Sequence, residues 1–283
     1  MRWWWNGRHA GLRNQCLGVR VRISPSVPLI LVGGCTRRPP KNKMKNAIVQ
    51  INIQDKSYQE PGFNGLFQSP INKYSIHSVK EYCDKIDVDH VVITKPKIQA
   101  KHPVFERFDL ILNDSWWNHY EQILYCDTDI IVDPMCPNFF KKFSDTNTMK
   151  TAVYAKYQKQ SIHWSNLVKK VPLYRKLDQK DFKERFFQTG VWSMNKSVAL
   201  QLRPYIRHFR KFKTYDDGQI LNWAFVKSKV PHQKINANWN YKLTDKPVPE
   251  EGKVNFIHAA GGRKHSMTSP ILKYCQSKWS NLQ

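Results

Sequence analysis

The chain has 283 residues, a length that suits one large domain or two small ones. Its 46 Lys and Arg against 22 Asp and Glu give a formal charge of +24. This balance favours polyanionic or phosphorylated partners, namely nucleic acid, an anionic membrane surface or a nucleotide-linked substrate. Hydrophobic residues make up 41% of the chain, enough for a packed core. No apolar run approaches the length of a membrane span, so any membrane contact is expected to be peripheral.

The cysteines bear on the compartment. All 6 of them are scattered along the chain, and no C-x-x-C pair occurs. This pattern excludes a disulfide framework and a zinc site, and it is typical of proteins in a reducing compartment. We therefore expect a cytoplasmic location.

Residues 1–43 differ from the remainder, because they contain nine Lys or Arg and no Asp or Glu. Their formal charge is therefore +9, and the rest of the chain carries +15 (24 − 9). Three interpretations compete. The segment is a signal peptide or lipoprotein leader with Cys35 as anchor, a basic disordered arm that binds nucleic acid or membrane, or an extension upstream of a true start at Met44. We favour the third, because a strand pattern begins directly after Met44, and we treat residues 1–43 as a non-core extension.

From Met44 onward, apolar periodicity predicts alternating strands and helices. Strands are expected over residues 47–53, 88–94, 123–126, 151–155, 186–195 and 254–257. Helices are expected over residues 74–86, 104–116 and 198–209, and a further helix is expected to begin at Asp216–Asp217. Pro204 should kink or shorten the helix over 198–209. The alternation predicts an α/β domain over residues 44–265, with a mostly parallel mixed sheet and helices on both faces, followed by a tail or helix over 266–283.

Two carboxylates interrupt one of these strands. The apolar run 123–126 is cut by Asp127-Thr128-Asp129 and resumes over 130–132. A buried unpaired charge costs several kcal/mol, so the two carboxylates indicate either a shared divalent cation or a tight turn that leaves both in water. Asp127, Asp129 and His258 are all expected at strand ends, where open α/β sheets bind their ligands.

Five segments in order resemble glycosyltransferase family 8, the glycogenin-like and lipopolysaccharide-galactosyltransferase-like group of GT-A fold. They are the D-x-D at 127–129, FQTGVW at 187–192, DGQILN at 217–222, WNY at 239–241 and FIHAAGGRK at 256–264. The sequence departs from the family pattern at Gln188 and Thr189, where Asn and Ser are usual, and at Gly218, which separates an Asp and a Gln that the family keeps adjacent. The resemblance covers residues 44–264 and implies a Rossmann-like GT-A domain.

The resemblance also implies site roles. Asp127, Asp129 and His258 would bind Mn²⁺ or Mg²⁺, and Asp127 would also contact the ribose of the donor. Mn²⁺ suits a set that includes imidazole better than Mg²⁺ does. Lys264 would neutralise the leaving diphosphate.

The remaining roles concern the donor and the transferred sugar. The resemblance implies that Asp217 and Gln219 face the transferred sugar and that Gln188 assists the reaction. The residues expected to hold the donor, with Tyr58 stacking on uracil, are Asn52, Gln54, Tyr58, Arg107 and Gly261.

The implied function is a metal-dependent glycosyltransferase that moves a hexose-type sugar from a nucleotide diphosphate donor, UDP-linked, to a glycan, lipid-linked or protein acceptor with retention. No acidic base for the acceptor is evident, which agrees with retention. Two alternatives remain. A nucleic-acid- or polyanion-binding protein fits the charge, although no recognised binding motif occurs and no specific nucleic-acid partner is expected. A metal-dependent nucleotidyltransferase also uses paired Asp residues, but residues 53–57 lack the Gly-rich phosphate loop that is usual there.

Overall fold

The computed structural model describes residues 44–54, 69–98, 102–153, 164–212, 216–243, 247–260 and 269–282. They belong to one compact unit, Lys43–Gln283. The predictions for residues 1–43, Tyr58, Gly261 and Lys264 lie outside the described residues. In the part of the chain that is described, no helix is both long and apolar enough to cross a bilayer.

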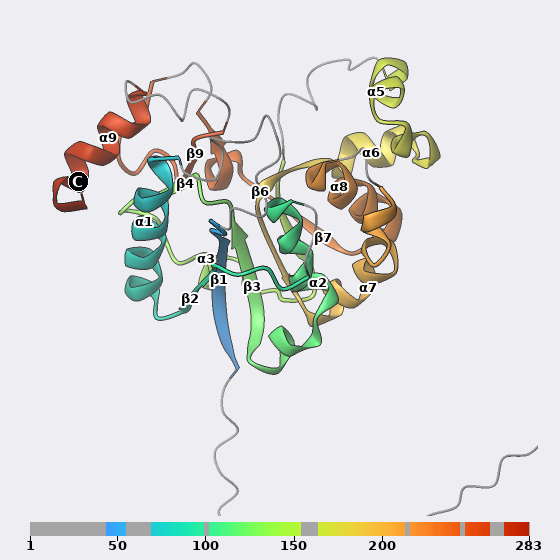
Figure 1. The fold of residues 1–283 in the computed structure, drawn as a ribbon, viewed down its shortest axis with the longest axis horizontal. Coiled ribbons are helices and arrows are strands. Elements are labelled where there is room, and N and C mark those ends of the chain that lie inside the picture. Colours follow the sequence, from blue (N-terminus) through green and yellow to red (C-terminus); the bar gives the residue numbers. More distant parts are fainter. Residues whose placement is uncertain are drawn as a thin grey trace, which may run out of the picture. The chain divides into compact units, whose positions relative to one another are not determined.

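The central element is a six-stranded mixed sheet with strand order β2-β1-β3-β6-β5-β7 (Figure 1). Its strands are β1 (Lys45–Ile51), β2 (Asp89–Ile93), β3 (Tyr120–Cys126), β5 (Met149–Val153), β6 (Phe187–Asn195) and β7 (His232–Ile235). The pairs β1–β2, β1–β3 and β5–β7 are parallel, whereas β6 runs antiparallel to both β3 and β5. The predicted α/β class with a mostly parallel mixed sheet is confirmed.

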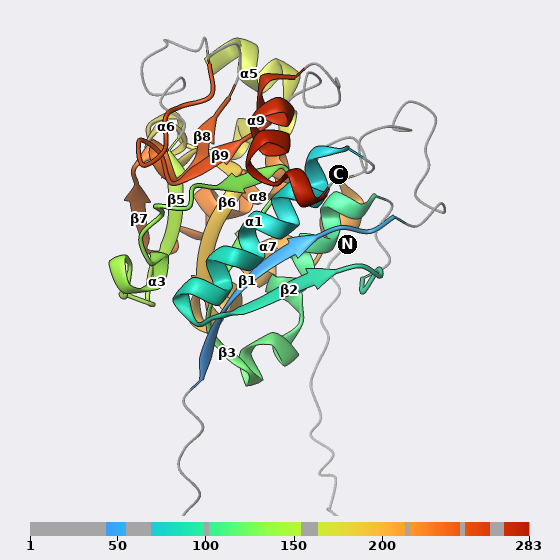
Figure 2. The same ribbon diagram turned by 90° about the vertical axis from the view of Figure 1, so that its left-hand side faces the viewer.

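Helices cover both faces of this sheet, as the two perpendicular views show (Figures 1 and 2). The α-helices are α1 (Ile71–Ile86), α2 (Asp109–Leu112), α3 (Phe139–Lys142), α5 (Trp164–Lys170), α6 (Gln179–Arg185), α7 (Lys196–Ile206), α8 (Asp217–Ser228) and α9 (Pro270–Lys278). The 3₁₀ segments are η2 (Pro103–Phe108), η3 (Asp114–Asn118), η4 (Pro172–Lys176), η5 (Phe209–Lys211), η6 (Ala237–Asn240) and η8 (Ser280–Leu282).

Side chains alternate along each strand and so supply two cores. Val49 and Ile123 pack with α2, α7 and α8 on one face, and Ile48 and Leu124 pack with α1 on the other. This is the period-2 geometry of a strand buried on both faces, which explains why the predicted strands are continuous apolar runs.

A second, smaller sheet was not predicted. It has the order β4-β9-β8 and consists of β4 (Ile130–Val132), β9 (Phe256–His258) and β8 (Tyr241–Lys242). β9 runs antiparallel to β4 and parallel to β8. The predicted strand over 254–257 therefore begins later, includes His258, and belongs to this sheet.

Two helix predictions need correction. The expected helix over 104–116 is three short pieces, because Asn113 is extended and its side chain caps the following 3₁₀ turn. α7 ends at Ile206 rather than 209, two residues after Pro204, as expected when a proline removes a backbone donor.

α9 lies beside α1, where the Trp279 ring stacks on the Tyr74 ring with 6.4 Å between their centroids, and the Trp279 indole N–H donates to Glu81 (Figure 2).

Candidate metal and nucleotide-sugar site

The turn after β3 brings the D-x-D carboxylates to one place. Ile130 N–H donates to the Asp127 carbonyl at 3.2 Å, which closes a tight turn between β3 and β4. The expected tight turn is therefore present in the backbone. The expectation that such a turn leaves both carboxylates in water was wrong, because Asp129 is buried and the Asp127 side chain is 24% exposed. Both carboxylates are largely withdrawn from water.

His258 reaches the turn through the small sheet. Ile130 pairs with His258 in the β4–β9 register, and Ala259 N–H donates to the Asp129 carbonyl at 2.9 Å. His258 Nε2 then lies 3.3 Å from Asp129 Oδ1 and 3.9 Å from Asp127 Oδ2. One ligand atom from each of the three side chains lies within 4.8 Å of the others.

Arg107 and Tyr125 fix the other oxygen of Asp127. Tyr125 Oη donates to Asp127 Oδ1 at 2.7 Å, and Arg107 donates to the same oxygen at 3.0 Å. The Arg107 guanidinium stacks on the Tyr125 ring at 4.7 Å and donates to the Thr189 carbonyl at 3.0 Å. Because Oδ1 is engaged on this side, Oδ2 is the oxygen that faces His258.

Asp217 is a second carboxylate next to Arg107. Its Oδ2 lies 2.8 Å from Arg107 Nε. The contact is an ion pair rather than a hydrogen bond, because the single Nε hydrogen is donated to the Val104 carbonyl. Burial raises the pKa of Asp217 to about 6, although Arg107 opposes the shift. Burial opposes the positive charge of Arg107, but its carboxylate neighbours raise its pKa overall, so this guanidinium is a permanent cation.

The cap at the start of α8 gives different environments to Asp217 and Gln219, which the resemblance placed together at the transferred sugar. Asp216 caps α8 by accepting from Gln219 N–H at 2.6 Å, and the Gln219 side chain accepts from Asp216 N–H at 3.3 Å. This is a capping box, so the side chain of Gln219 serves the helix terminus in this structure. Asp217, one residue inside the helix, faces Arg107 instead.

The second ring nitrogen of His258 has two side-chain neighbours. Nδ1 lies 2.8 Å from Asn240 Oδ1 and 3.1 Å from Gln188 Nε2. Asn240 also donates to the Gln188 backbone carbonyl at 3.2 Å. Metal-binding histidines usually have such a partner on the nitrogen remote from the ion, because it fixes the ring orientation.

The missing side chain of Gly190 leaves room for the side chains of His258 and Asp127. A Cβ at this position would lie 2.4 Å from His258 Cε1, 2.8 Å from Nδ1 and 3.0 Å from Asp127 Oδ2. Asp127 N–H also donates to the Gly190 carbonyl at 2.8 Å. β6 therefore packs its backbone against the site, and this close approach requires glycine.

The donor set fits a divalent cation. Two carboxylate oxygens and an imidazole nitrogen converge from the β3–β4 turn and from β9, and the Gly190 backbone lines the space beside them. Hard carboxylate oxygens with one borderline nitrogen suit Mn²⁺ better than Mg²⁺.

Sequence reasoning missed several supporting residues. Gln50 is fully buried on β1 and donates to the Asp127 carbonyl at 3.2 Å and to Ser75 Oγ at 3.0 Å. Its own carbonyl faces His90 Nε2 at 3.0 Å. A glutamine in an otherwise apolar strand was the available signal for Gln50. For Asn240, the signal was its place between two aromatic residues.

A hollow of about 290 Å³ adjoins the site. Gln188 lines this hollow and also contacts His258, so part of the hollow lies beside His258. The polar lining comes from the start of β6, the first turns of α8 and β8, namely Gln188, Thr189, Asp216, Gln219, Asn222 and Lys242. The apolar lining comes from α5, η4 and their surroundings and includes Leu167, Val171, Tyr174 and Phe186.

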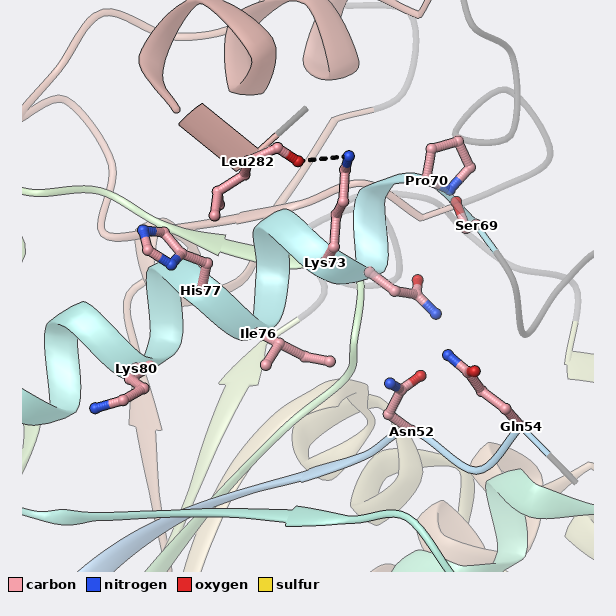
Figure 3. A pocket seen from close by; sticks show the side chains of 10 residues that line it. Asn52, Gln54, Ser69, Pro70, Lys73, Ile76, His77, Lys80 and Leu282 are labelled. Carbon is pink, nitrogen blue, oxygen red and sulfur yellow. Dashed lines mark hydrogen bonds between the residues drawn. The ribbon is translucent and has the colours of Figure 1, made fainter. Parts of the chain in front are cut away.

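Asn52 and Gln54 line a different and larger hollow, of about 730 Å³, beside α1 (Figure 3). Figure 3 shows both amide side chains at the end of β1, with Lys73 above them donating to the Leu282 carbonyl at 2.7 Å. The structure thus brings Asp127, Asp129 and His258 together with Arg107, Asp217 and Gln188, whereas Asn52 and Gln54 line the other hollow.

Comparison with known proteins gives matches among solved structures alone; no family model and no curated protein matches the sequence. A glycosyltransferase involved in the glycosylation of the major capsid of PBCV-1 is 14% identical, with a TM-score of 0.48 over 78% of this chain and 95% of that chain. The galactosyltransferase LgtC, solved with donor and acceptor sugar analogs, is 12% identical, with a TM-score of 0.45 over 84% of this chain and 100% of that chain. Mouse xyloside xylosyltransferase 1 is 11% identical, with a TM-score of 0.43 over 80% of this chain and 100% of that chain.

Proposed function

We propose that this chain is a metal-dependent glycosyltransferase that moves a hexose-type sugar from a nucleotide diphosphate donor, UDP-linked, to an acceptor hydroxyl. The observation that carries the proposal is the convergence of Asp127, Asp129 and His258, with ligand atoms within 4.8 Å of one another. The order of the family 8-like segments in the sequence agrees with it. The bound ion would be Mn²⁺ or Mg²⁺ and would stabilise the negative charge of the leaving diphosphate.

The chain's own charges divide into two groups at this site. Asp127 Oδ2, Asp129 Oδ1 and His258 Nε2 would hold the cation, whereas Arg107 balances the remaining charge of Asp127 and Asp217. Arg107 is buried and has polar contacts through three of its nitrogens. We therefore assign it to positioning Asp127, with donor contact as the role that the resemblance implies. Lys264 is proposed, from its motif alone, to neutralise the diphosphate.

The adjoining hollow offers a place for the acceptor. Its volume of about 290 Å³ is just below the ~300–1,000 Å³ range of small-molecule sites and suits a group of monosaccharide size. The lining combines polar side chains with apolar ones, so it offers partners both for the hydroxyls and for the C–H face of a sugar ring. We propose that the acceptor enters here beside Gln188.

The reaction would break the bond between the anomeric carbon and the diphosphate and form a bond from that carbon to the acceptor oxygen. In this route the acceptor proton would pass to the leaving diphosphate, because Gln188 carries no ionisable group to accept it. This route requires no acidic base from the chain and agrees with retention of configuration.

The test is a screen of nucleotide sugars for turnover with and without Mn²⁺. Wild type should consume a UDP-sugar in a metal-dependent manner, and Asp129→Ala should lose both turnover and Mn²⁺ binding while keeping its thermal unfolding transition. Asp84→Ala removes an exposed carboxylate on α1 and serves as the matched control. Full turnover by Asp129→Ala, or by wild type in excess chelator, would contradict the proposal.

A further inference from the structure

Gln50 is a fully buried polar residue within the apolar run of β1, between Val49 and Ile51. A buried amide costs stability unless its donors and its acceptor find partners. Leucine or methionine would fill a similar volume without that requirement. The glutamine therefore calls for an explanation beyond packing.

Both N–H groups and the carbonyl of the Gln50 amide have partners. Nε2 donates to the Asp127 carbonyl at 3.2 Å and to Ser75 Oγ on α1 at 3.0 Å. Oε1 lies 3.0 Å from Nε2 of His90 on β2. A backbone carbonyl can only accept, so the contact with Asp127 fixes which end of the amide faces the turn. Gln50 thus joins β2 and α1 to the turn between β3 and β4.

The Asp127 carbonyl is the acceptor on which the D-x-D turn closes. It also accepts from Ile130 N–H at 3.2 Å, and its peptide plane continues into Thr128. Gln50 holds this plane from the side of β1. The contacts of the turn with β6 and β9 are backbone hydrogen bonds, whereas the contact with Gln50 can be removed by substitution.

Helix α1 supports the same segment at a second point. Ser78 Oγ accepts from Val132 N–H at 3.2 Å and donates to the Ser75 carbonyl at 3.0 Å. Ser75 and Ser78 are buried and lie three residues apart, on neighbouring positions of one helix face. α1 therefore holds β4 directly, and it holds the preceding turn through Gln50.

We propose that Gln50 is a positioning residue of the metal site, because it holds the Asp127 carbonyl and so sets the direction of the Asp127 and Asp129 carboxylates. The inference rests on the metal site of the proposed function. Arg107 and Tyr125 fix the side chain of Asp127, whereas Gln50 fixes its backbone. Loss of Gln50 should therefore loosen the turn while leaving every ligand atom in the chain.

Gln50→Met removes the contact with Asp127 at a similar side-chain length. Mn²⁺ should bind about 10- to 100-fold more weakly, the loss typical when an outer partner of a metal ligand is removed. Gln122→Met is the matched control. Gln122 is a buried glutamine near the start of β3 that donates to Ser193 Oγ at 2.9 Å, at the end of the strand remote from Asp127. Its replacement should lower the midpoint of thermal unfolding and leave Mn²⁺ affinity as in wild type.

A measurement on wild type gives an independent test if Gln50→Met fails to fold. The ¹⁵N–¹H signals of the Gln50 side-chain amide should shift when diamagnetic Mg²⁺ binds, because this amide contacts the turn that carries the ligands. The signals of the Gln122 amide should stay where they are.

The experiment is a Mn²⁺ titration of wild type, Gln50→Met and Gln122→Met followed by electron paramagnetic resonance, with thermal unfolding of the same samples and NMR of wild type. The expected result is weaker Mn²⁺ binding by Gln50→Met alone. Wild-type affinity in folded Gln50→Met, an equal loss of affinity in Gln122→Met, or Gln50 amide signals that Mg²⁺ does not move would overturn the inference and leave the proposed function standing. A wild-type protein that binds no metal would overturn both.

Discussion

Replacement of Gly190 by alanine tests the geometry of the site directly. The added Cβ would lie 2.4 Å from His258 Cε1 and 2.8 Å from its Nδ1. Ordinary van der Waals contact begins near 3.5 Å, so the imidazole must move by roughly 1 Å. His258 is 5% exposed and is held by Asn240 at 2.8 Å, so this movement breaks that hydrogen bond and displaces Nε2 from the two carboxylates.

The expected magnitudes follow from that displacement. Overpacking of a buried position costs about 1–3 kcal/mol of unfolding free energy. A 1 Å displacement of a reacting or binding group costs on the order of 100-fold, and we expect a loss of about that size in Mn²⁺ affinity. The assays are thermal unfolding and Mn²⁺ titration on the same preparation.

Gly218→Ala is the matched control. Its nearest contact is Thr189 Oγ1 at 3.0 Å, a small side-chain atom outside the ligand set, and alanine favours the first turn of α8. This variant should keep its Mn²⁺ affinity. If Gly190→Ala binds Mn²⁺ as tightly as wild type does, then His258 is not held against β6 as described.

Three further predictions concern charge, pH and packing. Arg107→Met removes a buried cation between two carboxylates and should lower the free energy of unfolding by about 3–5 kcal/mol in urea titrations, whereas an exposed-site change such as Lys80→Met should have little effect. Burial lowers the pKa of His90 to about 4, below its usual 6.5, so the unfolded chain binds a proton at a higher pH than the folded chain does. The contribution of His90 to stability is therefore complete above about pH 6.5 and falls as the pH drops toward 4. His90→Gln should show a smaller loss of stability between about pH 7 and 5. Trp279→Ala should cost about 3–5 kcal/mol, because this 6%-exposed side chain joins α9 to α1, and an unchanged unfolding midpoint would show that α9 does not stabilise the domain.

The sequence predicted five of the six strands of the large sheet, and the central ones are apolar runs with both faces buried. It did not predict β7 (His232–Ile235), because Ile235 is the one buried residue of that short, polar strand. Residues such as Ile48 and Val49 face opposite cores, so the pattern is continuous rather than alternating. The small sheet escaped prediction because β4 and β9 have three residues each, below the length at which periodicity is informative. Its pairing joins segments that are remote in sequence, which local propensity cannot specify.

In the candidate site, too, the sequence identified some residues and missed contacts that depend on the tertiary structure. Asp127 and Asp129 stand out because charge is costly in a buried strand. Arg107 was expected near the donor, but its ion pairs with Asp127 and Asp217 depend on a tertiary arrangement that no local pattern encodes. Likewise, Gln219 matched a family position, yet its spacing from Asp216 fits a capping box, and the structure shows that local interaction.

The central claim is that Asp127, Asp129 and His258 bind one divalent cation that a nucleotide diphosphate shares. The most direct measurement is Mn²⁺ binding by equilibrium titration, with and without UDP, for wild type, Asp129→Ala and His258→Ala. We predict one tightly bound ion per wild-type chain, tighter binding when UDP is present, and loss of that ion in both variants with the fold retained. Mn²⁺ binding that is equal in all three proteins, or that UDP does not affect, would contradict it.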